Sequence, residues 1–425
     1  MENAPLLDRY VELIGETFLE NIYKKARSVE GIRVLHINTT HRGGGVAELL
    51  GALTPITDNL NIQHKRKVIQ LDPDSNHFTT RIVDMLQGGI AGTIPEKEKQ
   101  NFLRWLQQAL PQQPTEEENA DIYFIHDFQL IPLARLFPWL QPTIWFCHID
   151  TDKPNPDAVD YIMEYQRDYQ LCVFNNPFTV FKQHLGDRAQ VLTLGIDPFT
   201  EKNAALSADV GEECLIRCGI DPKRPLITQV ARFDRWKNPW QAIDIYRRVK
   251  REEPEVQLAL VGAMEAADDI NALNILHDVQ KYAQGDPDIH LLSDPKVVRH
   301  REVNALQRYS SVILQRSTKE GFGLTITEAM WKYQPVIGTT ATGPRTQIIH
   351  GTNGYISDET EEATEYTLHL LRDRDKWEEM GQQAHEHVRQ HYLIPTMLIH
   401  YLSLLESVSG RTPSQTDNPG AIPAD

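Results

Sequence analysis

The chain has 425 residues, of which 40% are hydrophobic and 24% charged, a composition typical of a soluble globular protein that is too long for one hydrophobic core. Its formal net charge of −16 argues against nucleic acid or an anionic membrane surface as the main partner. The sequence shows neither a basic-then-apolar leader nor an apolar run long enough to span a bilayer, so we expect a cytoplasmic protein that does not enter a membrane.

Short apolar runs alternate with helical patterns along nearly the whole chain. We expect strands at 32–38, 66–72, 122–126, 143–149, 171–176 and 191–196 in the first half, and at 226–232, 256–262, 289–294, 311–317 and 335–340 in the second. Apolar strands that are separated by helices form parallel sheets covered on both faces. Two successive sets therefore predict an α/β protein with two doubly wound, Rossmann-like domains.

A polar, proline-containing stretch after residue 196 marks the boundary between these domains. The predicted organisation is an N-terminal helical extension (1–29), a first domain (30–200), a second domain (201–385), a C-terminal helix that returns to the first domain (386–408) and a disordered tail (409–425). The return is expected because the late helix has more apolar surface than a free terminal helix needs. The tail is rich in turn-forming residues and lacks apolar periodicity.

The first loop of interest lies in HINTTHRGGGVAELLGAL, from His36 to Leu53. Gly43, Gly44 and Gly45 stand between a buried strand and an amphipathic helix, where α/β proteins hold phosphate against a helix N-terminus. The spacing is not G-x-G-x-x-G, which disfavours a dinucleotide-dependent oxidoreductase. Ligands bind at the carboxyl ends of open parallel sheets, so we expect this loop to form one wall of a cleft between the domains.

A second loop, RFDRWKNP, follows the first strand of the second half. Arg232 and Lys237 flank it, and a guanidinium with an ammonium would neutralise a diphosphate there. The alternative is an ordinary surface ion pair between Arg232 and Asp234. Phe233 and Trp236 between the charges favour a fixed, partly buried loop.

The third stretch is KEGFGLTITEAM. Glu320 follows a strand, glycines then expose the backbone, and a helix is predicted to begin near Thr325, which would offer its N-terminus to an anion. Glu328 has a structural alternative, because Thr325-x-x-Glu328 also reads as a capping box. A structural role is less obvious for Glu320, which is a candidate for binding sugar hydroxyls or stabilising positive charge.

These motifs carry a family resemblance. EGFGLTITEAM matches the E-x-x-x-x-x-x-x-E element of retaining glycosyltransferases of the GT-B fold, and RFDRWKNP resembles their diphosphate-binding segment. GGGVAELL, LQGG, HDFQL, CHID, ITQVARFDRWK, HREVNALQR and EGFGLTITEAMWKYQPVIG together resemble the trehalose glycosyltransferring synthases of glycosyltransferase family 4. The resemblance covers roughly residues 30 to 405 in matching order and implies a GT-B fold.

The resemblance also implies a site. Catalytic roles would fall to Glu320, Arg232, Lys237 and His126, the last lying beside the donor sugar. Donor binding would involve Gly43, Gly44, Gly45, Arg232, Lys237, Val298, Glu320, Gly321, Phe322, Gly323, Leu324 and Glu328, with the ribose on Glu328 and the base near the backbone of Lys296 to Val298. Acceptor binding would involve Gly44, Asp84, Gln87, His148 and Asp150.

The implied chemistry needs neither a metal nor a cofactor. Retention without a covalent intermediate requires no nucleophile paired with an acid/base of the glycosidase kind. The leaving diphosphate, neutralised by Arg232 and Lys237, takes the acceptor's proton, and catalysis is mainly positioning and charge stabilisation. Asp150 and Asp152 form a D-x-D pattern that resembles a metal motif, but the same pattern occurs three more times in the chain.

We therefore predict a retaining glycosyltransferase that transfers glucose from UDP-, ADP- or GDP-glucose to glucose, forming trehalose. The chain departs from the synthase pattern at Val83 and Asp84, in place of His-Asn, and at Phe146, in place of Arg, so another small polyol, sugar or hydroxy acid is an alternative acceptor. A catalytically inactive nucleotide-sugar-binding regulator is a second alternative. The N-terminal helix is a candidate homodimer element.

Overall fold

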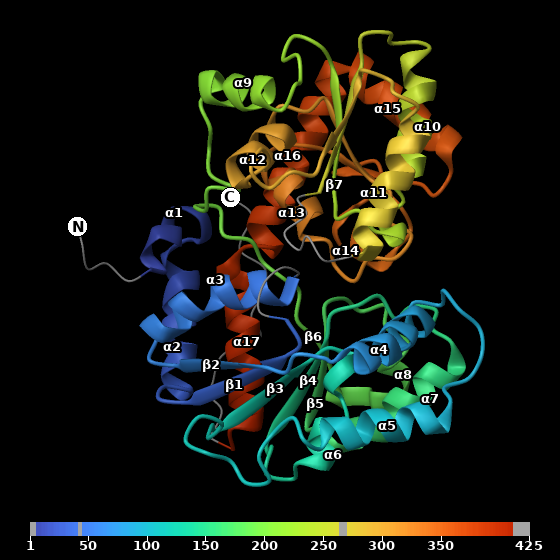
Figure 1. Ribbon diagram of the computed structural model, residues 1–425. Helices are drawn as coiled ribbons and strands as arrows, with labels where there is room; N and C mark the ends of the chain where they lie inside the picture. Colours follow the sequence, from blue (N-terminus) through green and yellow to red (C-terminus); the bar gives the residue numbers. More distant parts are fainter. Residues whose placement is uncertain (1–5, 41–44, 263–269, 411–425) are drawn as a thin grey trace. The chain divides into compact units, whose positions relative to one another are not determined.

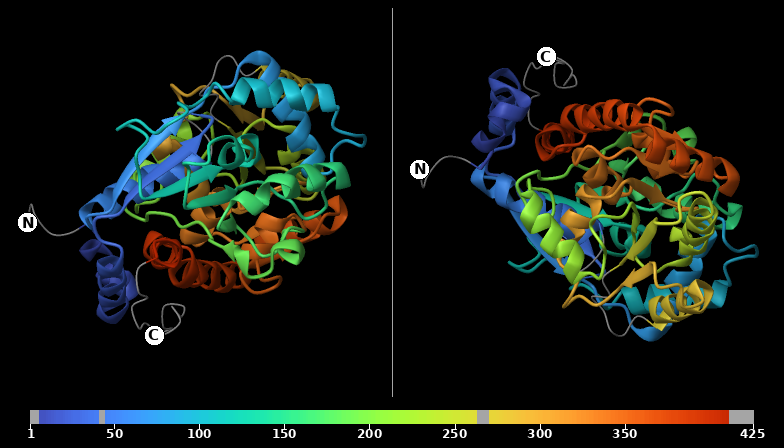
Figure 2. Two further views of the ribbon diagram at one scale, coloured as in Figure 1. Left: turned by 90° about the horizontal axis from the view of Figure 1, so that it is seen from below. Right: turned by 90° about the horizontal axis from the view of Figure 1, so that it is seen from above.

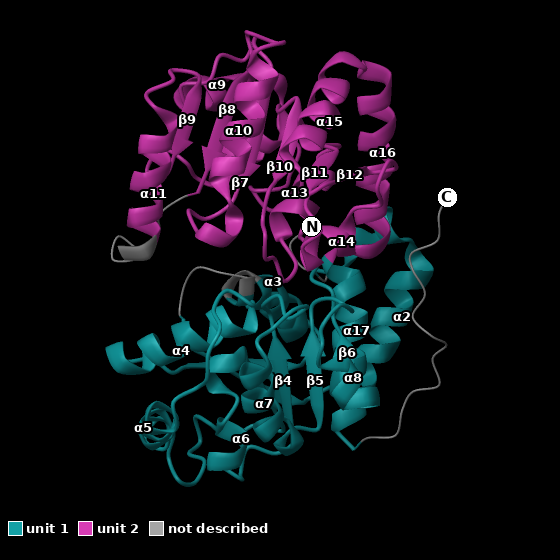
Figure 3. Ribbon diagram, turned by 90° about the vertical axis from the view of Figure 1, so that its right-hand side faces the viewer, with its two compact units in different colours: residues 1–195, 394–425 teal, residues 196–393 magenta. Residues whose placement is uncertain are grey.

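The computed structural model describes residues 6–40, 45–262 and 270–410 (Figure 1). The chain divides into two compact units, unit 1 with residues 1–195 and 394–425 and unit 2 with residues 196–393 (Figure 3). The chain returns from unit 2 to unit 1 at Ile394, just after helix α16 (Arg374–His391). The predicted end of the second domain, at residue 385, lies inside this helix. Pro395 cannot extend α16, and it stands instead in the first turn of the next helix.

Unit 1 contains a parallel sheet of six strands among its described residues, in the order β2-β1-β3-β4-β5-β6. The strands are β1 (Arg33–Asn38), β2 (Gln63–Val68), β3 (Ile122–His126), β4 (Thr143–Cys147), β5 (Leu171–Phe174) and β6 (Ala189–Val191). The helices are α1 (Val11–Ile14), α2 (Glu16–Ser28), α3 (Gly45–Asn59), α4 (Pro73–Leu86), α5 (Glu96–Leu106), α6 (Leu133–Leu136), α7 (Pro156–Tyr165), α8 (Lys182–Leu185) and α17 (Ile394–Val408), with 3₁₀ turns η1 (Asp8–Tyr10), η2 (Phe128–Leu130), η3 (Gln166–Asp168) and η4 (Gly186–Arg188).

Unit 2 contains a second parallel sheet, in the order β12-β11-β10-β7-β8-β9. Its strands are β7 (Leu226–Val230), β8 (Gln257–Val261), β9 (Ile289–Leu292), β10 (Val312–Gln315), β11 (Val336–Gly338) and β12 (Gly354–Ile356). Its helices are α9 (Ala208–Arg217), α10 (Pro239–Lys250), α11 (Ile270–Ala283), α12 (His300–Arg308), α13 (Leu324–Trp331), α14 (Thr342–Gln347), α15 (Thr360–Arg372) and α16, with the 3₁₀ turn η5 (Arg235–Lys237).

Both sheets are doubly wound, as the sequence predicts. The strand order reverses between β1 and β3 in unit 1 and between β7 and β10 in unit 2. At such a reversal the connections leave toward opposite faces, which opens a crevice beyond the carboxyl ends of the two strands, and this is where α/β proteins bind ligands. The loops after β1 and β3, and after β7 and β10, are therefore the places to look for a site.

The strand predictions were wrong at the less apolar edges. β2 lies at Gln63–Val68, earlier than expected, because this edge strand carries mostly charged or polar, half-exposed side chains that give no apolar run. β6 covers Ala189–Val191 rather than 191–196, and β12 was not predicted at all. Strands of three residues at a sheet edge bury too few side chains to leave a pattern in the sequence.

Successive residues of β1 face opposite sides of sheet 1. Leu35 and Ile37 join the apolar core formed with α4, α5 and α7. His36 faces the other side, toward Leu49 and Leu53 of α3 and Tyr401 of α17. A polar residue in the middle of this strand is therefore buried against two helices.

Helix α17 belongs to unit 1 and packs beside α2 (Figures 1 and 2). The buried face of α2 includes Phe18, Leu19 and Ile22. Lys25 of α2 forms an ion pair with Glu406 of α17, at 2.6 Å between Nζ and Oε2, and both side chains are almost fully buried. The apolar face of the N-terminal helix is thus used within the chain, and the homodimer remains a prediction.

Within the described ranges, no helix is long and apolar enough to cross a membrane. The four cysteines, Cys147, Cys172, Cys214 and Cys218, are free thiols and buried.

The Lys25–Glu406 pair yields a test of how α17 is attached. Replacing Lys25 by Met leaves the Glu406 carboxylate buried without its cation, so we expect the free energy of unfolding to fall by about 3–5 kcal/mol, whereas Lys25→Met combined with Glu406→Met should restore most of it. Urea unfolding curves measure both. The exposed neighbour Lys24→Met is the control and should change little; an equal loss in the double variant would contradict a paired-charge role.

Candidate functional site

The site in unit 2 is built by the two strands at the reversal of strand order. β7 is followed by the segment that holds Arg232 and Lys237, and β10 by the segment that holds Glu320. The strands pair directly, with Val312 opposite Ile227, so their following loops leave the same edge of the sheet side by side. Sequence positions more than 80 residues apart thus become neighbours.

Lys237 and Glu320 form the central contact. Their Nζ and Oε2 atoms are 2.5 Å apart, and the two side chains are only 16% and 11% exposed. Ser317 and Gln315 also donate to Oε2 of Glu320, at 3.3 and 3.4 Å. A carboxylate oxygen with three donors, one of them an ammonium, is rigidly held.

The loop that carries Lys237 is fixed by its own backbone. Asp234 accepts a hydrogen bond from the N–H of Trp236 at 2.9 Å, which starts η5. Asn238 has a positive φ of 46°, and Pro239 then occupies the first turn of α10. The fixed, partly buried loop expected from the aromatic residues is what the structure contains.

Arg232 lies differently from Lys237. Its side chain is 71% exposed, and its Nη2 lies 3.7 Å from Oδ2 of Asp234. This is the surface pair that the sequence left open as an alternative, and a pair this exposed contributes little to stability. The structure therefore brings Lys237 onto Glu320 and leaves the Arg232 guanidinium on the solvent side.

The glycine-rich loop is pinned from the side by α14. The Glu320 carbonyl accepts hydrogen bonds from the Gly343 N–H and the Thr342 hydroxyl, each at 2.7 Å, and the Phe322 carbonyl accepts from Gln347 at 2.6 Å. The approach leaves no room for side chains: a Cβ on Gly343 would lie 2.3 Å from the Phe322 oxygen. Gly323 has a φ of 85°, which glycine adopts without strain.

Helix α13 begins at Leu324, next to the expected start, with Gly323 as its N-cap and no side-chain cap bond. The predicted capping box between Thr325 and Glu328 is wrong, because Thr325 already lies inside the helix. The N–H groups of its first turn are thus uncapped by any side chain, as a helix N-terminus that receives an anion would be.

Glu328 is buried at 3% exposure and pairs with Lys202, at 2.7 Å between Oε1 and Nζ. Its other oxygen, Oε2, is buried and has no hydrogen-bond partner among the described residues. A buried carboxylate oxygen is costly to leave unsatisfied. Lys202, which was not predicted as a site residue, lies in the polar stretch at the predicted domain boundary.

Lys332 is a second cation that the sequence analysis missed. It is fully buried, with Nζ donating to Asn203, Gln307 and the Glu328 carbonyl at 2.9–3.0 Å. Burial lowers its pKa to about 7, and the Glu328 charge acts in the opposite direction. The only sequence signal for Lys332 was its i, i+4 spacing from Glu328, and that spacing is more typical of an ion pair on an exposed helix face.

The proposed base-binding backbone lies after β9. The N–H groups of Val297 and Val298 bond the Asp294 carbonyl, and that of Lys296 bonds the Asp294 side chain, at 2.8–3.0 Å. Val298 is buried. The backbone donors that would meet a base are thus engaged with Asp294.

In unit 1, His126 lies at the carboxyl end of β3, beside β1. Its Nε2 is 2.9 Å from Nδ1 of His36, and its Nδ1 is 2.9 Å from Nε2 of His148. The residue is 2% exposed. Both ring nitrogens are therefore engaged with other imidazoles, and in this arrangement the His126 side chain offers neither to a sugar.

Asp127 follows with a positive φ of 61°. Its Oδ1 accepts the His148 N–H at 2.9 Å, and it makes no side-chain cap bond to the following 3₁₀ turn. Burial raises its pKa to about 6, although the bond from His148 acts in the opposite direction. A non-glycine residue in this conformation beside a candidate site is typical of a constrained functional segment.

The predicted acceptor residues lie on two adjoining segments. Gln87 ends α4, and Gly88 turns the chain with a φ of 75°, where a Cβ would lie 2.5 Å from the Lys153 carbonyl. The Met85 carbonyl accepts the Asn155 N–H at 2.8 Å. The end of α4, with Asp84 and Gln87, is thus tied to the segment after β4 that carries His148 and Asp150.

These acceptor candidates differ in exposure. Asp150 is buried and accepts the Asp152 N–H at 3.1 Å, whereas His148 and Asp84 are partly exposed. Phe146, one of the departures from the synthase pattern, is buried, and its ring centroid lies 4.0 Å from that of His148. It packs on the imidazoles rather than pointing to a ligand.

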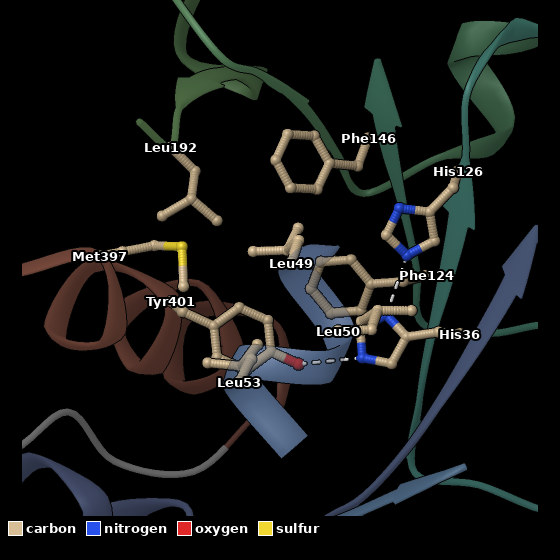
Figure 4. A pocket seen from close by; sticks show the side chains of 10 residues that line it. All are labelled: His36, Leu49, Leu50, Leu53, Phe124, His126, Phe146, Leu192, Met397 and Tyr401. Atoms are coloured by element: carbon tan, nitrogen blue, oxygen red, sulfur yellow. Dashed lines mark hydrogen bonds between the residues drawn. The ribbon is translucent and has the colours of Figure 1, made fainter. Parts of the chain in front are cut away.

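Gly43 and Gly44 lie outside the described residues. Gly45 is the first residue of α3. Beneath that helix is a small cavity lined by His36, His126, Phe124, Phe146, Leu192, leucines of α3, and Met397 and Tyr401 of α17 (Figure 4). Among the described residues, no group of three or more His, Cys, Asp or Glu side chains is placed to hold a metal ion.

Comparison with known proteins places this geometry in a family. Residues 36–180 match the family model described as trehalose synthase, N-terminal domain, and residues 217–387 match that of glycosyl transferases group 1. A trehalose synthase of Thermococcus litoralis is 37% identical over 94% of this chain and 97% of its own. The chain belongs to the trehalose synthase family. The trehalose synthase of Rubrobacter xylanophilus is 36% identical over 94% and 96%.

The fold of this glycosyltransferase is GT-B. A solved structure from E. coli, described as trehalose-6-phosphate bound with UDP-2-fluoro glucose, superposes with a TM-score of 0.67 at 14% sequence identity, covering 90% of this chain and 100% of that one. The two doubly wound units agree with that architecture, and the resemblance read from the motifs is confirmed.

The buried histidines of unit 1 predict a pH dependence of stability. Burial first, and then the neighbouring His64, His126 and His148 with Arg66, hold the pKa of His36 well below its ordinary value. Below about pH 6.5 the unfolded chain therefore binds a proton that folded His36 excludes, and the free energy of unfolding falls by about 1.4 kcal/mol per pH unit for this residue.

His36→Gln keeps a hydrogen-bonding side chain but cannot take up that proton. We expect its unfolding free energy, measured in urea between pH 7 and 5, to fall less steeply with acid than that of the unaltered chain. If the unfolding free energies of the two proteins fall equally with acid, folded His36 does not resist protonation.

Proposed function

We propose that the protein is a cytoplasmic, retaining glycosyltransferase that transfers glucose from a nucleoside-diphosphate glucose to glucose, forming trehalose. The observation that carries this proposal is the joint placement of the Lys237–Glu320 pair, the pinned glycine loop and the half-satisfied Glu328 beyond β7 and β10. The family membership supports the product, and the UDP-sugar in the E. coli neighbour supports the donor class.

Each part of a nucleotide sugar has a counterpart in unit 2. The diphosphate would meet the Lys237 ammonium and the uncapped N-terminus of α13, and the exposed Arg232 is free to swing onto it. A ribose hydroxyl would donate to Oε2 of Glu328, with Lys202 holding Oε1. The base would lie against residues 296–298.

The transferred sugar would lie beside Glu320. Because this carboxylate is held against Lys237, it places negative charge next to the sugar while the ammonium faces the leaving group. Such preorganised charge stabilises a transition state in which the glycosyl group becomes cationic and the diphosphate anionic.

The proposed step balances without another reactant. The bond between the anomeric carbon and the phosphate oxygen breaks, and a bond from that carbon to an acceptor hydroxyl oxygen forms on the same face. The hydroxyl proton passes to the departing phosphate oxygen. The protein's part is to align the two sugars and to neutralise the diphosphate.

A different small acceptor is the second candidate. It is favoured by the departures from the synthase pattern at Val83, Asp84 and Phe146, because Asp84 lies on the segment proposed for the acceptor. The donor chemistry of unit 2 is the same in both cases.

The test of the proposed function is a product assay. Purified protein is incubated with UDP-, ADP- or GDP-glucose and with glucose, other monosaccharides, polyols or hydroxy acids, and the products are identified by NMR, which also reports the anomeric configuration. We expect α,α-linked trehalose from glucose. Formation of another glucoside and no trehalose would show that glucose is not the acceptor. The absence of any transfer would overturn the proposal.

Two variants examine the central pair. Lys237→Ala removes the cation facing the leaving group and Glu320→Gln removes the carboxylate charge, so we expect kcat to drop by about 100-fold or more in each. Lys281→Ala, which removes an exposed lysine on α11, is the matched control and should keep full activity. Unchanged turnover in Glu320→Gln would exclude the proposed charge role.

A further inference from the structure

An unbroken chain of hydrogen-bonded side chains crosses unit 1. Its members come from five adjacent strands in their order across the sheet: His64 from β2, His36 from β1, His126 from β3, and His148 and Asn175 from just after β4 and β5. From His64 to His148 each step also moves toward the carboxyl edge, since His64 is the second residue of its strand and His148 lies beyond the end of its own, while Asn175 lies level with His148.

The contacts are direct. His148 meets His126, and His126 meets His36, each at 2.9 Å between ring nitrogens. The hydroxyl of Tyr401, on α17, bridges Nε2 of His36 at 3.3 Å and Nε2 of His64 at 3.0 Å. Figure 4 shows the part formed by His126, His36 and Tyr401.

The Asn175 end determines the direction of every proton in the chain. Nδ2 of Asn175 lies 3.3 Å from the His148 carbonyl and 3.4 Å from its Nδ1. A carbonyl only accepts, so the NH₂ group must face it, and Nδ1 of His148 must then be an acceptor. His148 consequently carries its proton on Nε2, and by the same reasoning His126 and His36 do too.

The other end of the chain fits the same direction. Thr57, on α3, donates its one hydroxyl proton to the Leu53 or Thr54 carbonyl, each at 3.1 Å, as helical threonines do. Its oxygen then accepts from Nδ1 of His64, at 2.8 Å. Nε2 of His64 is then the acceptor of the Tyr401 proton, and the Tyr401 oxygen accepts from His36.

The chain is electrically neutral. Burial holds the pKa of His36 and His126 well below its ordinary value, and lowers the pKa of His148 to about 3 and that of His64 to about 4. Phe146 packs over His148 and Phe124 over His36, so that apolar rings cover the imidazoles. Apolar residues would fill this space at lower cost, whereas imidazoles whose ring nitrogens all have partners specify one arrangement.

We propose that this polarised chain fixes the tautomer and orientation of His148, the partly exposed imidazole at the carboxyl edge, and that Tyr401, His36, His64 and Asn175 are positioning residues for glycosyl transfer. Both ring nitrogens of His148 have partners in the chain, Nε2 with His126 and Nδ1 with Asn175, so the chain decides the plane in which this partly exposed ring is held. The role in transfer rests on the proposed function; the tautomers do not.

The first test is spectroscopic and needs no substrate. In ¹⁵N-histidine-labelled protein at pH 7, two-bond ¹⁵N–¹H spectra should show His36, His126 and His148 as Nε2–H tautomers and His64 as Nδ1–H. Asn175→Asp removes the donor and offers an acceptor, so His148 should change to Nδ1–H or to the imidazolium. Mixed tautomers in the unaltered protein, or no change in Asn175→Asp, would overturn the proposal.

The second test is kinetic. Tyr401→Phe leaves the Nε2–H of His36 without an acceptor and loosens the row of imidazoles, and we expect kcat/KM for transfer to fall by about tenfold or more. Tyr169→Phe is the matched control: it also removes one buried tyrosine hydroxyl bond, to the Ile131 carbonyl at 2.7 Å, but lies outside the chain.

Melting temperatures of both tyrosine variants separate stability from positioning. A comparable loss of activity in Tyr169→Phe and Tyr401→Phe at comparable stability would reduce the chain to a structural feature and overturn the proposal. If the unaltered protein transfers no glucose, the proposed function fails, while the tautomer spectra still decide whether the chain is polarised.

Discussion

The rest of the structure depends on parallel strand pairing with one reversal of order in each sheet. Parallel pairing brings all carboxyl ends to one edge, and the reversal separates the connections there. In unit 2 this places the Lys237 and Glu320 loops side by side after β7 and β10; in unit 1 it places His36 and His126 in contact on β1 and β3. The candidate site residues gather where the strand order reverses.

Buried polar groups then decide how each site is held. Glu320 and Lys237 satisfy one another, Glu328 has one oxygen on Lys202 and one without a partner, and the imidazoles of unit 1 satisfy each other in a row. Complete satisfaction favours a single rigid arrangement, while an unsatisfied buried oxygen is a position prepared for a donor. The residues that satisfy one another are candidates for supporting the sites, and the unsatisfied Glu328 oxygen is a candidate for contacting a ligand.

Helix α17, late in the chain, packs on α2, near its start, and also contacts the buried imidazoles of unit 1. It packs beside α2 through an almost fully buried ion pair, and it contributes Tyr401 to the row of imidazoles. Helix α17 is therefore part of unit 1 in both packing and hydrogen bonding. In contrast to the buried pair of α17, the Arg232 side chain is exposed, and the fold does not need its charge.

The sequence by itself determined the fold class, the apolar strands of both sheets, the loops at their carboxyl ends and the family, because these leave local patterns: apolar runs, glycine clusters and motifs in order. It placed Glu320, Glu328, Lys237 and His126 at strand or helix ends, but only the tertiary structure decided their partners. Lys202, Tyr401 and Asn175 carry no local signal, since their contacts join residues that are from 27 to 365 positions away along the chain. Such pairs are set by strand order and helix packing, which no short stretch of sequence contains.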